Sequence, residues 1–301
     1  MATSLFELLP SIPYGPPKRH HWGPITSTLN WCEEDYYLTE YCAEFVNTMT
    51  NLIFIYVSCY GIYTTLKEGH DRIFTVTFCG LLCVGVGSFL FHATLWYSMQ
   101  LVDELSMLYT TLLVCWLASF SHNRSTTFAT IFGFLCTLFA VAISLIYHHL
   151  GDPVFHQNAY AILTAGVLGH SFYIMETKLR KIDSAEVNRM WKMVSWGVGL
   201  FLTGFLLWSL DNIYCGRIKN WRHAVGLPWG VLAEGHGWWH LLTAVGAYYE
   251  LVWGLYLRCC LQDRREEFKL DWPGYFSLPV VRKWREGERG REEARKLKKV
   301  Q

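Results

Sequence analysis

Seven long apolar segments that contain no lysine or arginine constrain this chain more than any other feature of its sequence. A transmembrane helix needs about 20 mostly apolar residues, and a cation at the centre of a bilayer is costly. All 26 Lys and Arg residues fall outside the seven segments. The expected helices cover residues 45–66, 73–95, 101–120, 127–147, 159–175, 194–208 and 237–257.

The fold class predicted from these segments is all-α, a bundle of seven transmembrane helices. Hydrophobic residues make up 52% of the chain and charged residues only 17%, below the usual quarter of a soluble domain. The net charge of +1 gives no reason to expect a nucleic-acid partner. We expect three regions: an N-terminal segment, 1–44; a membrane domain, 45–257; and a charged tail, 258–301, which we expect to be mobile.

The distribution of cations predicts the orientation, because cytoplasmic loops carry an excess of Lys and Arg. The tail holds 13 of them, and the first, third and fifth loops hold eight. Only five occur in the N-terminal segment and the other loops. The tail should therefore be cytosolic and the N-terminus lumenal. The sequon at Asn123 then falls in the cytosol and should stay unmodified.

With this orientation, unusual polar residues from four stretches meet at the lumenal side. His92 lies near the end of the second helix, and Asp103 and Glu104 lie at the start of the third. His236 and His240 begin the seventh, and the acidic run NWCEEDYYLTEYCAE precedes the first. We expect these residues to form one site.

The histidine spacing points to a metal. His236 and His240, like Ser88 and His92, are four residues apart and share a helix face. Three histidines with one open position form a catalytic zinc arrangement, and a nearby carboxylate takes the proton of the activated water. A histidine pair alone also fits interhelical hydrogen bonding.

Two points stay open at this stage. Adjacent helix positions point about 100° apart, so only one of Asp103 and Glu104 faces the metal, and the residues do not say which. Three further histidines, His148, His149 and His156, follow the fourth segment, in a loop where we expect them to face solvent.

Several stretches resemble the alkaline ceramidases: SFLFHATL, LVDELSM and HGWWHLLT. The wider pattern of these motifs is similar to a membrane-hydrolase superfamily that also contains the adiponectin receptors. The stretches YGPPKRHHWGPITSTLNWCEEDY and AEFVNTMTNLIF resemble the ceramidases and not the receptors. The resemblance covers residues 14–260.

The resemblance implies an intramembrane amidase that hydrolyses ceramide, phytoceramide or dihydroceramide to a sphingoid base and a fatty acid. His92, His236 and His240 would hold zinc. Asp103 would deprotonate the attacking water, and Ser88 would help to stabilise the oxyanion. The alternative is an adiponectin-receptor-like protein with structural zinc, against which the N-terminal stretches argue. The expected partner is a ceramide-type lipid within the bilayer.

The resemblance also implies a calcium site in the N-terminal segment. Ca²⁺ takes six to eight oxygen ligands. Side-chain oxygens would come from Asn30, Glu33, Asp35 and Glu44, and a carbonyl from Trp31. In the vertebrate pattern the first position is usually Asp and the third is often Asn, whereas here Asn30 comes first and Asp35 third. This exchange leaves the total charge of the ligand set unchanged. The alternative is a solvated acidic segment that caps the first helix.

The last two expectations concern the lumen and the compartment. Cys32 and Cys215 flank the lumenal side, where cysteines tend to bridge, and the resemblance also suggests a cysteine pair here. Free thiols, or pairing through Cys42, remain open. Lys298 and Lys299 resemble a dilysine retrieval signal, which predicts a protein of the endoplasmic reticulum membrane, with the Golgi as a second possibility.

Overall fold

The computed structural model describes residues 10–122 and 125–290, and long helices dominate them. The α-helices are α2 (Phe45–Thr50), α3 (Leu52–Glu68), α4 (Arg72–Thr94), α5 (Tyr97–His122), α6 (Thr126–Leu150), α7 (Pro153–Ile174), α8 (Ser184–Val225) and α9 (Gly235–Leu261). The shorter elements are η1 (Met175–Leu179), η2 (Trp229–Ala233), η3 (Arg264–Glu266), β1 (Phe268–Asp271) and β2 (Val280–Lys283). The dilysine at Lys298 and Lys299 lies outside the described residues.

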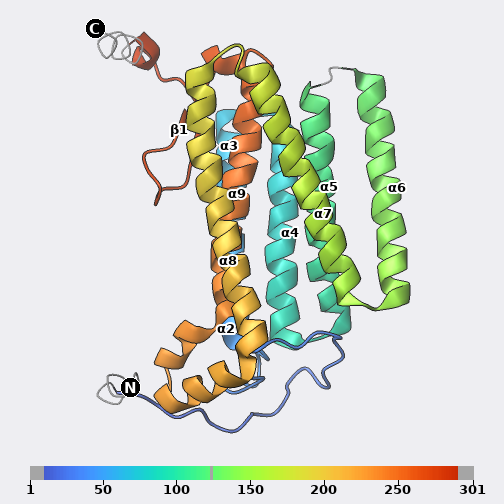
Figure 1. Cartoon of the computed structure of the whole chain (residues 1–301), viewed down its shortest axis with the longest axis vertical. Coiled ribbons are helices and arrows are strands. Elements are labelled where there is room, and N and C mark those ends of the chain that lie inside the picture. The colour runs from blue at the N-terminus through green and yellow to red at the C-terminus, as the bar shows by residue number, and fades with distance from the viewer. Residues whose placement is uncertain (1–9, 123–124, 291–301) are drawn as a thin grey trace.

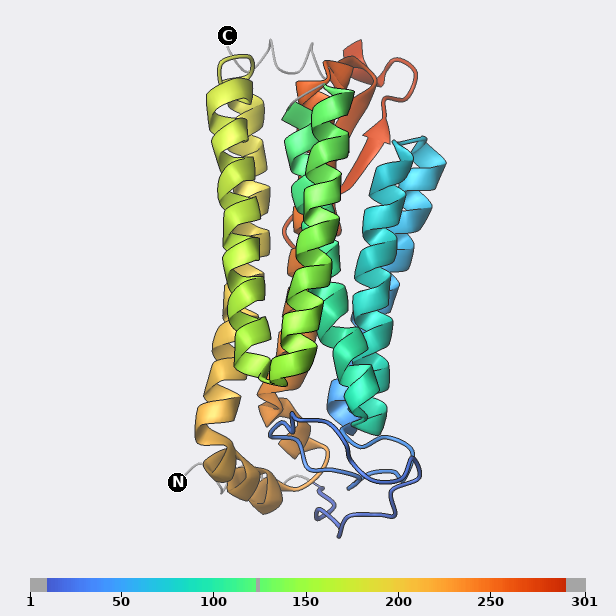
Figure 2. The same ribbon diagram turned by 90° about the vertical axis from the view of Figure 1, so that its right-hand side faces the viewer.

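The long helices run side by side along the long axis of the molecule (Figure 1). The irregular segment before α2 crosses one end of the bundle, and the two strands lie at the other end (Figure 2). The two ends of the described chain are therefore at opposite ends of the bundle.

Six of the seven expected segments each fall on one long helix, and the first, 45–66, is divided between α2 and α3. Among the described residues, four helical stretches are long and apolar enough to cross a membrane. They are Phe45–Glu68, Arg72–Thr94, Thr126–Leu150 and Ser184–Val225. Of the remaining long helices, α5 and α9 carry the polar residues singled out above, which lowers their hydropathy. The helical bundle is thus confirmed.

Helix α9 packs at the centre of the main core, against α3, α4, α5 and α8. Glycines bring α8 and α9 close together: a Cβ on Gly246 would lie 2.9 Å from the carbonyl oxygen of Gly197. Small residues at such crossings are typical of helices that pack in membranes. This packing fixes the helix that carries His236 and His240.

Helix α8 is longer than the segment predicted for it, 194–208. It has 42 residues and a non-helical residue inside, Tyr214, with φ −106° and ψ 17°. Beyond this kink the helix turns across the end of the bundle (Figure 1). The prediction covered only the apolar stretch of the helix. The part of α8 beyond the kink contains polar residues, so it was not predicted as helix.

The fold is mostly helical, as expected, but residues 268–283 of the expected tail add a small β-hairpin. Strands β1 and β2 pair antiparallel, with Phe268 opposite Lys283. Phe268, Leu270 and Val281 are buried in the main core. These apolar side chains lie between charged neighbours, so the average composition of the tail concealed them.

Candidate metal centre

Three buried histidines meet at the end of the bundle that faces the N-terminal segment. His92 comes from the last turn of α4, and His236 and His240 come from the first turns of α9. One ring nitrogen from each lies within 4.8 Å of the others. Among the described residues this is the one group of three or more His, Cys, Asp or Glu side chains arranged to hold a metal.

Neighbouring side chains orient two of the three rings. The Nδ1 atom of His92 lies 2.5 Å from a carboxylate oxygen of Glu44. The Nδ1 atom of His240 lies 3.0 Å from the hydroxyl of Thr50 and 3.4 Å from the amide nitrogen of Asn51. A histidine that binds metal through one nitrogen is usually held in this way through the other.

The donor set fits a divalent transition metal. The Nδ1 atom of His236 is buried and has no hydrogen-bond partner within the described part of the chain. An unpaired buried polar atom is costly, and coordination would satisfy such a group. Three neutral imidazoles with one open position are the ligand set of catalytic zinc.

Ser88 and Asp103 come together where α4 and α5 touch. A Cβ on Gly87 would lie 3.2 Å from the backbone nitrogen of Asp103, which is a tight contact, so glycine favours this close approach. The hydroxyl of Ser88 lies beside the carboxylate of Asp103. Ser88 is one turn before His92 on the same helix. The carboxylate therefore lies on the side of α5 that faces α4.

Glu104 faces a different set of partners. Its carboxylate accepts hydrogen bonds from the hydroxyl of Tyr147 and, at 3.0 Å, from the amide of Gln100. A ring nitrogen of His156 lies 3.5 Å away. The expectation that His156 faces solvent is wrong, because α7 begins at Pro153 and buries it.

The proposed calcium residues surround the start of α2. Glu33 accepts the backbone N–H groups of Val46 and Asn47 at 2.6 and 2.8 Å, so it caps this helix. Glu44 accepts the N–H of Trp31 at 3.2 Å and is fully buried. The capping function that was the alternative to calcium is therefore present, but Glu33 and Glu44 are buried and not solvated.

The remaining members of this set are more accessible. The amide of Asn30 donates to one carboxylate oxygen of Asp35 at 3.1 Å, and the other oxygen is buried without a partner in the described residues. Burial and the charge of Glu44 raise the pKa of Asp35. Burial, Glu234 and Glu44 raise the pKa of Glu33 well above its usual value. Asn30, Glu33 and Asp35 line a pocket of roughly 630 Å³.

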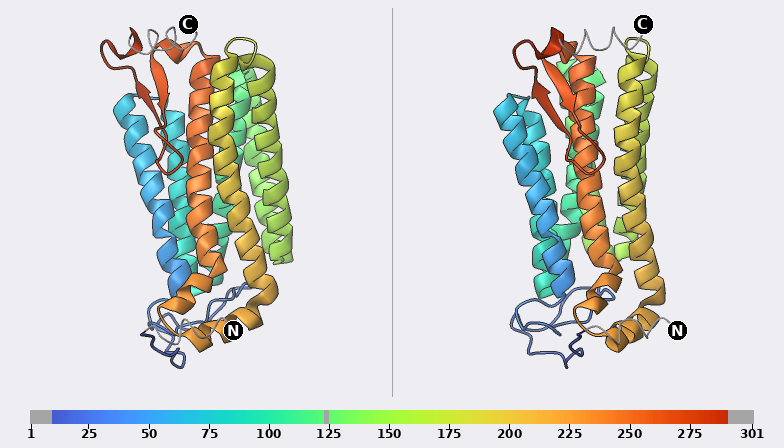
Figure 3. Two further views of the ribbon diagram at one scale, coloured as in Figure 1. Left: turned by 60° about the vertical axis from the view of Figure 1, so that its left-hand side comes forward. Right: turned by 90° about the vertical axis from the view of Figure 1, so that its left-hand side faces the viewer.

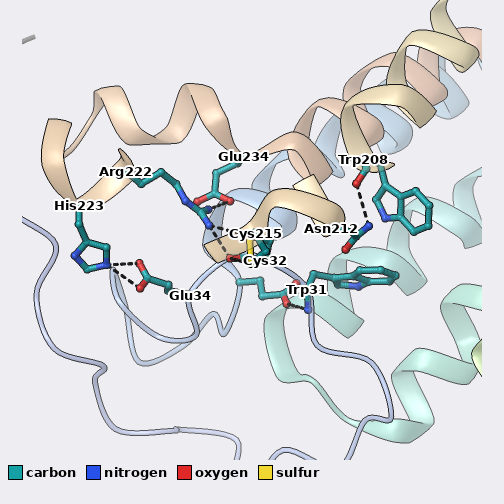
Figure 4. Close-up of a disulfide and its surroundings, with 10 residues drawn as sticks. Trp31, Cys32, Glu34, Trp208, Asn212, Cys215, Arg222, His223 and Glu234 are labelled. Carbon is teal, nitrogen blue, oxygen red and sulfur yellow. Dashed lines mark hydrogen bonds and ion pairs between the residues drawn. A yellow bond between two sulfur atoms is a disulfide. The ribbon is translucent and has the colours of Figure 1, made fainter. Parts of the chain in front are cut away.

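The pocket adjoins a disulfide between Cys32 and Cys215, with Cα atoms 5.4 Å apart (Figure 4). Arg222, beyond the kink of α8, is fully buried beside it and donates to the carbonyl oxygen of Cys32 at 2.7 Å. Its guanidinium is also paired with Glu234, the residue that precedes α9. Sequence reasoning missed this pair, although Glu234 lies only two residues before the HxxxH motif.

Comparisons with known proteins agree with one another. The sequence matches the family model described as Ceramidase over residues 23–282, so the match extends beyond α9 and through β1. It is 34% identical to mouse alkaline ceramidase 3 over 270 residues, which cover 87% of this chain and 96% of the relative. It is also 34% identical to alkaline ceramidase YPC1 of Saccharomyces cerevisiae, over 77% of this chain and 76% of the relative. An Arabidopsis thaliana alkaline ceramidase is 27% identical over 75% of this chain and 82% of its own length.

Proposed function

The chain belongs to the ceramidase family of amide hydrolases, and from that premise we propose that it is a zinc-dependent enzyme of the membrane that cleaves the amide of ceramides. The products are a sphingoid base and a free fatty acid. The observation that carries the proposal is the buried group of His92, His236 and His240. A zinc ion held by them would act as a Lewis acid toward water and the amide carbonyl.

The side chains on α4 and α5 supply the proton chemistry in this proposal. Asp103 accepts the proton of the attacking water and returns one to the leaving amine. The Ser88 hydroxyl, which has one proton, orients the Asp103 carboxylate before the reaction. Once Asp103 has accepted the proton of the water, Ser88 donates to the oxygen on which negative charge develops. Glu104 takes no part, because its carboxylate is committed to Tyr147 and Gln100.

We also propose a calcium site formed by Asn30, Glu33, Asp35, Glu44 and the carbonyl of Trp31. Two features support it: the unpartnered buried oxygen of Asp35 and the raised pKa values of crowded carboxyls. A divalent cation would offset that repulsion. Since Glu44 also contacts His92, calcium there would act on activity through the position of this histidine.

Calcium removal tests this part of the proposal. A calcium-selective chelator should lower ceramide hydrolysis by the purified protein, and added Ca²⁺ should restore it. The Asp35→Asn variant should need more Ca²⁺ for the same recovery. Full activity after verified removal of calcium would reject a regulatory site.

The proposed setting is a membrane of the endoplasmic reticulum or Golgi, crossed seven times, with residues 1–44 in the lumen and the tail in the cytosol. The apolar helices and the positions of the two chain ends support it. The substrate then enters laterally from the bilayer. The family match does not favour the alternative of an adiponectin-receptor-like protein with structural zinc.

A substrate panel tests the central function. Purified protein should release sphingoid base and fatty acid in equal amounts from at least one of ceramide, phytoceramide and dihydroceramide, as measured by lipid mass spectrometry. The Asp103→Asn protein is the control for hydrolysis by a contaminant. Failure to release fatty acid from any of the three, by zinc-loaded protein, would refute the proposal.

A further inference from the structure

The loop between β1 and β2 is the most apolar part of the C-terminal region. Residues 272–281 read WPGYFSLPVV and contain no charge. Asp271 and Arg282 stand at its two ends, and their side chains form an ion pair with a 2.6 Å separation. The base of this hairpin therefore carries an ion pair, whereas the side chains at its tip are aromatic or aliphatic.

The tip lies along the flank of the bundle and does not project from its end (Figure 3). The ring of Trp196, from α8, lies 5.1 Å from that of Tyr275 and 6.0 Å from that of Phe276. The hydroxyl of Tyr249, from α9, contacts the carbonyl oxygens of Tyr275 and Ser277 at 3.0 and 2.7 Å. Both helices thus hold the loop in place.

The contacts between the loop and α9 lie well below the end of the helix bundle. Tyr249 precedes Arg258, the cation near the end of α9, by nine residues, which is roughly 13 Å at the helical rise. The base of the hairpin is level with the end of α3, because the N–H of Lys283 donates to Glu68 at 2.8 Å. A hydrocarbon leaflet is about 15 Å thick. With Arg258 and the base of the hairpin at the membrane surface, a loop tip at the level of Tyr249 lies inside the hydrocarbon leaflet.

Several polar groups of the loop find partners within the protein, which is what irregular backbone in lipid requires. Pro273 and Pro279 have no N–H to satisfy. The hydroxyl of Tyr248 donates to the carbonyl oxygen of Pro279 at 2.9 Å. The N–H of Ser277 donates to the carbonyl of Gly274 at 3.1 Å, and its hydroxyl oxygen accepts the N–H of Gly274 at 3.1 Å.

Beside their contacts with Trp196, the two aromatic side chains of the tip stay accessible from outside: Phe276 is 99% exposed and Tyr275 51%. We propose that residues 272–279 form a re-entrant loop in the leaflet at the C-terminal end of α9, where Phe276 contacts lipid acyl chains. The inference rests on the membrane orientation proposed above and is independent of the metal.

A photoreactive residue tests this directly. Benzoylphenylalanine replaces Phe276 in the full chain, which is reconstituted in phosphatidylcholine vesicles, irradiated and digested for mass spectrometry. The high exposure of Phe276 means that the replacement does not disturb the fold. A matched protein carries the same residue in place of Glu286, which is exposed beyond β2. We expect acyl-chain adducts at 276 and none at 286.

Two outcomes would overturn the inference: an unreacted probe at 276, which would place the tip in water, or a crosslink from 276 to a second copy of the chain. Ceramide hydrolysis is measured on the same samples. Acyl adducts on a protein that hydrolyses no ceramide would keep the re-entrant loop and reject the proposed function. Ceramide hydrolysis without acyl adducts at 276 would keep the proposed function and reject the re-entrant loop.

Discussion

Asp103 and Glu104 are neighbours in α5, yet their carboxylates have different surroundings. Asp103 lies beside Ser88 on the side facing α4, whereas Glu104 is hydrogen bonded to Tyr147 and Gln100. Asp103→Asn should therefore lower the rate of ceramide hydrolysis by about 10²–10⁴-fold, as expected for loss of a positioned proton acceptor, and should retain zinc. Glu104→Gln should have a smaller effect. The reverse order of the two variants would reject Asp103 as the base.

At this scale the sequence was informative where spacing along one helix carries the signal. The i, i+4 relation links His236 to His240 directly, and alternating spans bring His92 to the same side. The contact between Glu44 and His92 has no such signal, since the two residues are 48 positions apart. Glu44 appeared only as a calcium ligand, and its contact with a zinc-ligand candidate needed the fold.

The start of α9 is the element on which the site depends most. The buried pair of Arg222 and Glu234 joins it to the kinked end of α8 and to the Cys32 carbonyl. Arg222→Met would leave Glu234 as an unpaired buried charge, so the free energy of unfolding should fall by about 3–5 kcal/mol. Thermal unfolding in detergent measures this.

Two variants accompany that measurement. Arg217→Met, at an exposed position on the same helix, should change stability by less than about 0.5 kcal/mol. The double change Arg222→Met with Glu234→Met should recover part of the loss, since no charge is then left unpaired. An Arg222→Met protein as stable as the wild type would show that the pair does not hold α9.

Among the elements, the helices with a long apolar stretch were predictable, including α5 and α9 with their few polar residues, whereas the elements in charged segments were not. The kinked extension of α8 and the strands β1 and β2 lie in regions of high charge. A few apolar side chains in these regions, such as Phe268 and Val281, are buried in the core. Their burial cannot be predicted from the charged residues beside them in the sequence.

We expect the two ends of the whole molecule to lie on opposite sides of the membrane. Sequons are glycosylated in the lumen of microsomes. A sequon added before residue 1 should therefore be glycosylated, and a sequon added after residue 301 should not. The native sequon at Asn123, which lies outside the described residues, should also stay unmodified. Glycans on the C-terminal tag would reverse the proposed orientation.

Metal content, measured together with ceramide hydrolysis, tests the central claim most directly. The purified wild-type protein should contain about one zinc per chain, as a three-histidine site implies. His240→Ala should lose both the zinc and the hydrolysis, whereas His149→Ala, at an exposed position at the end of α6, should keep both. A His240→Ala protein that retains one zinc per chain and full activity would contradict the account.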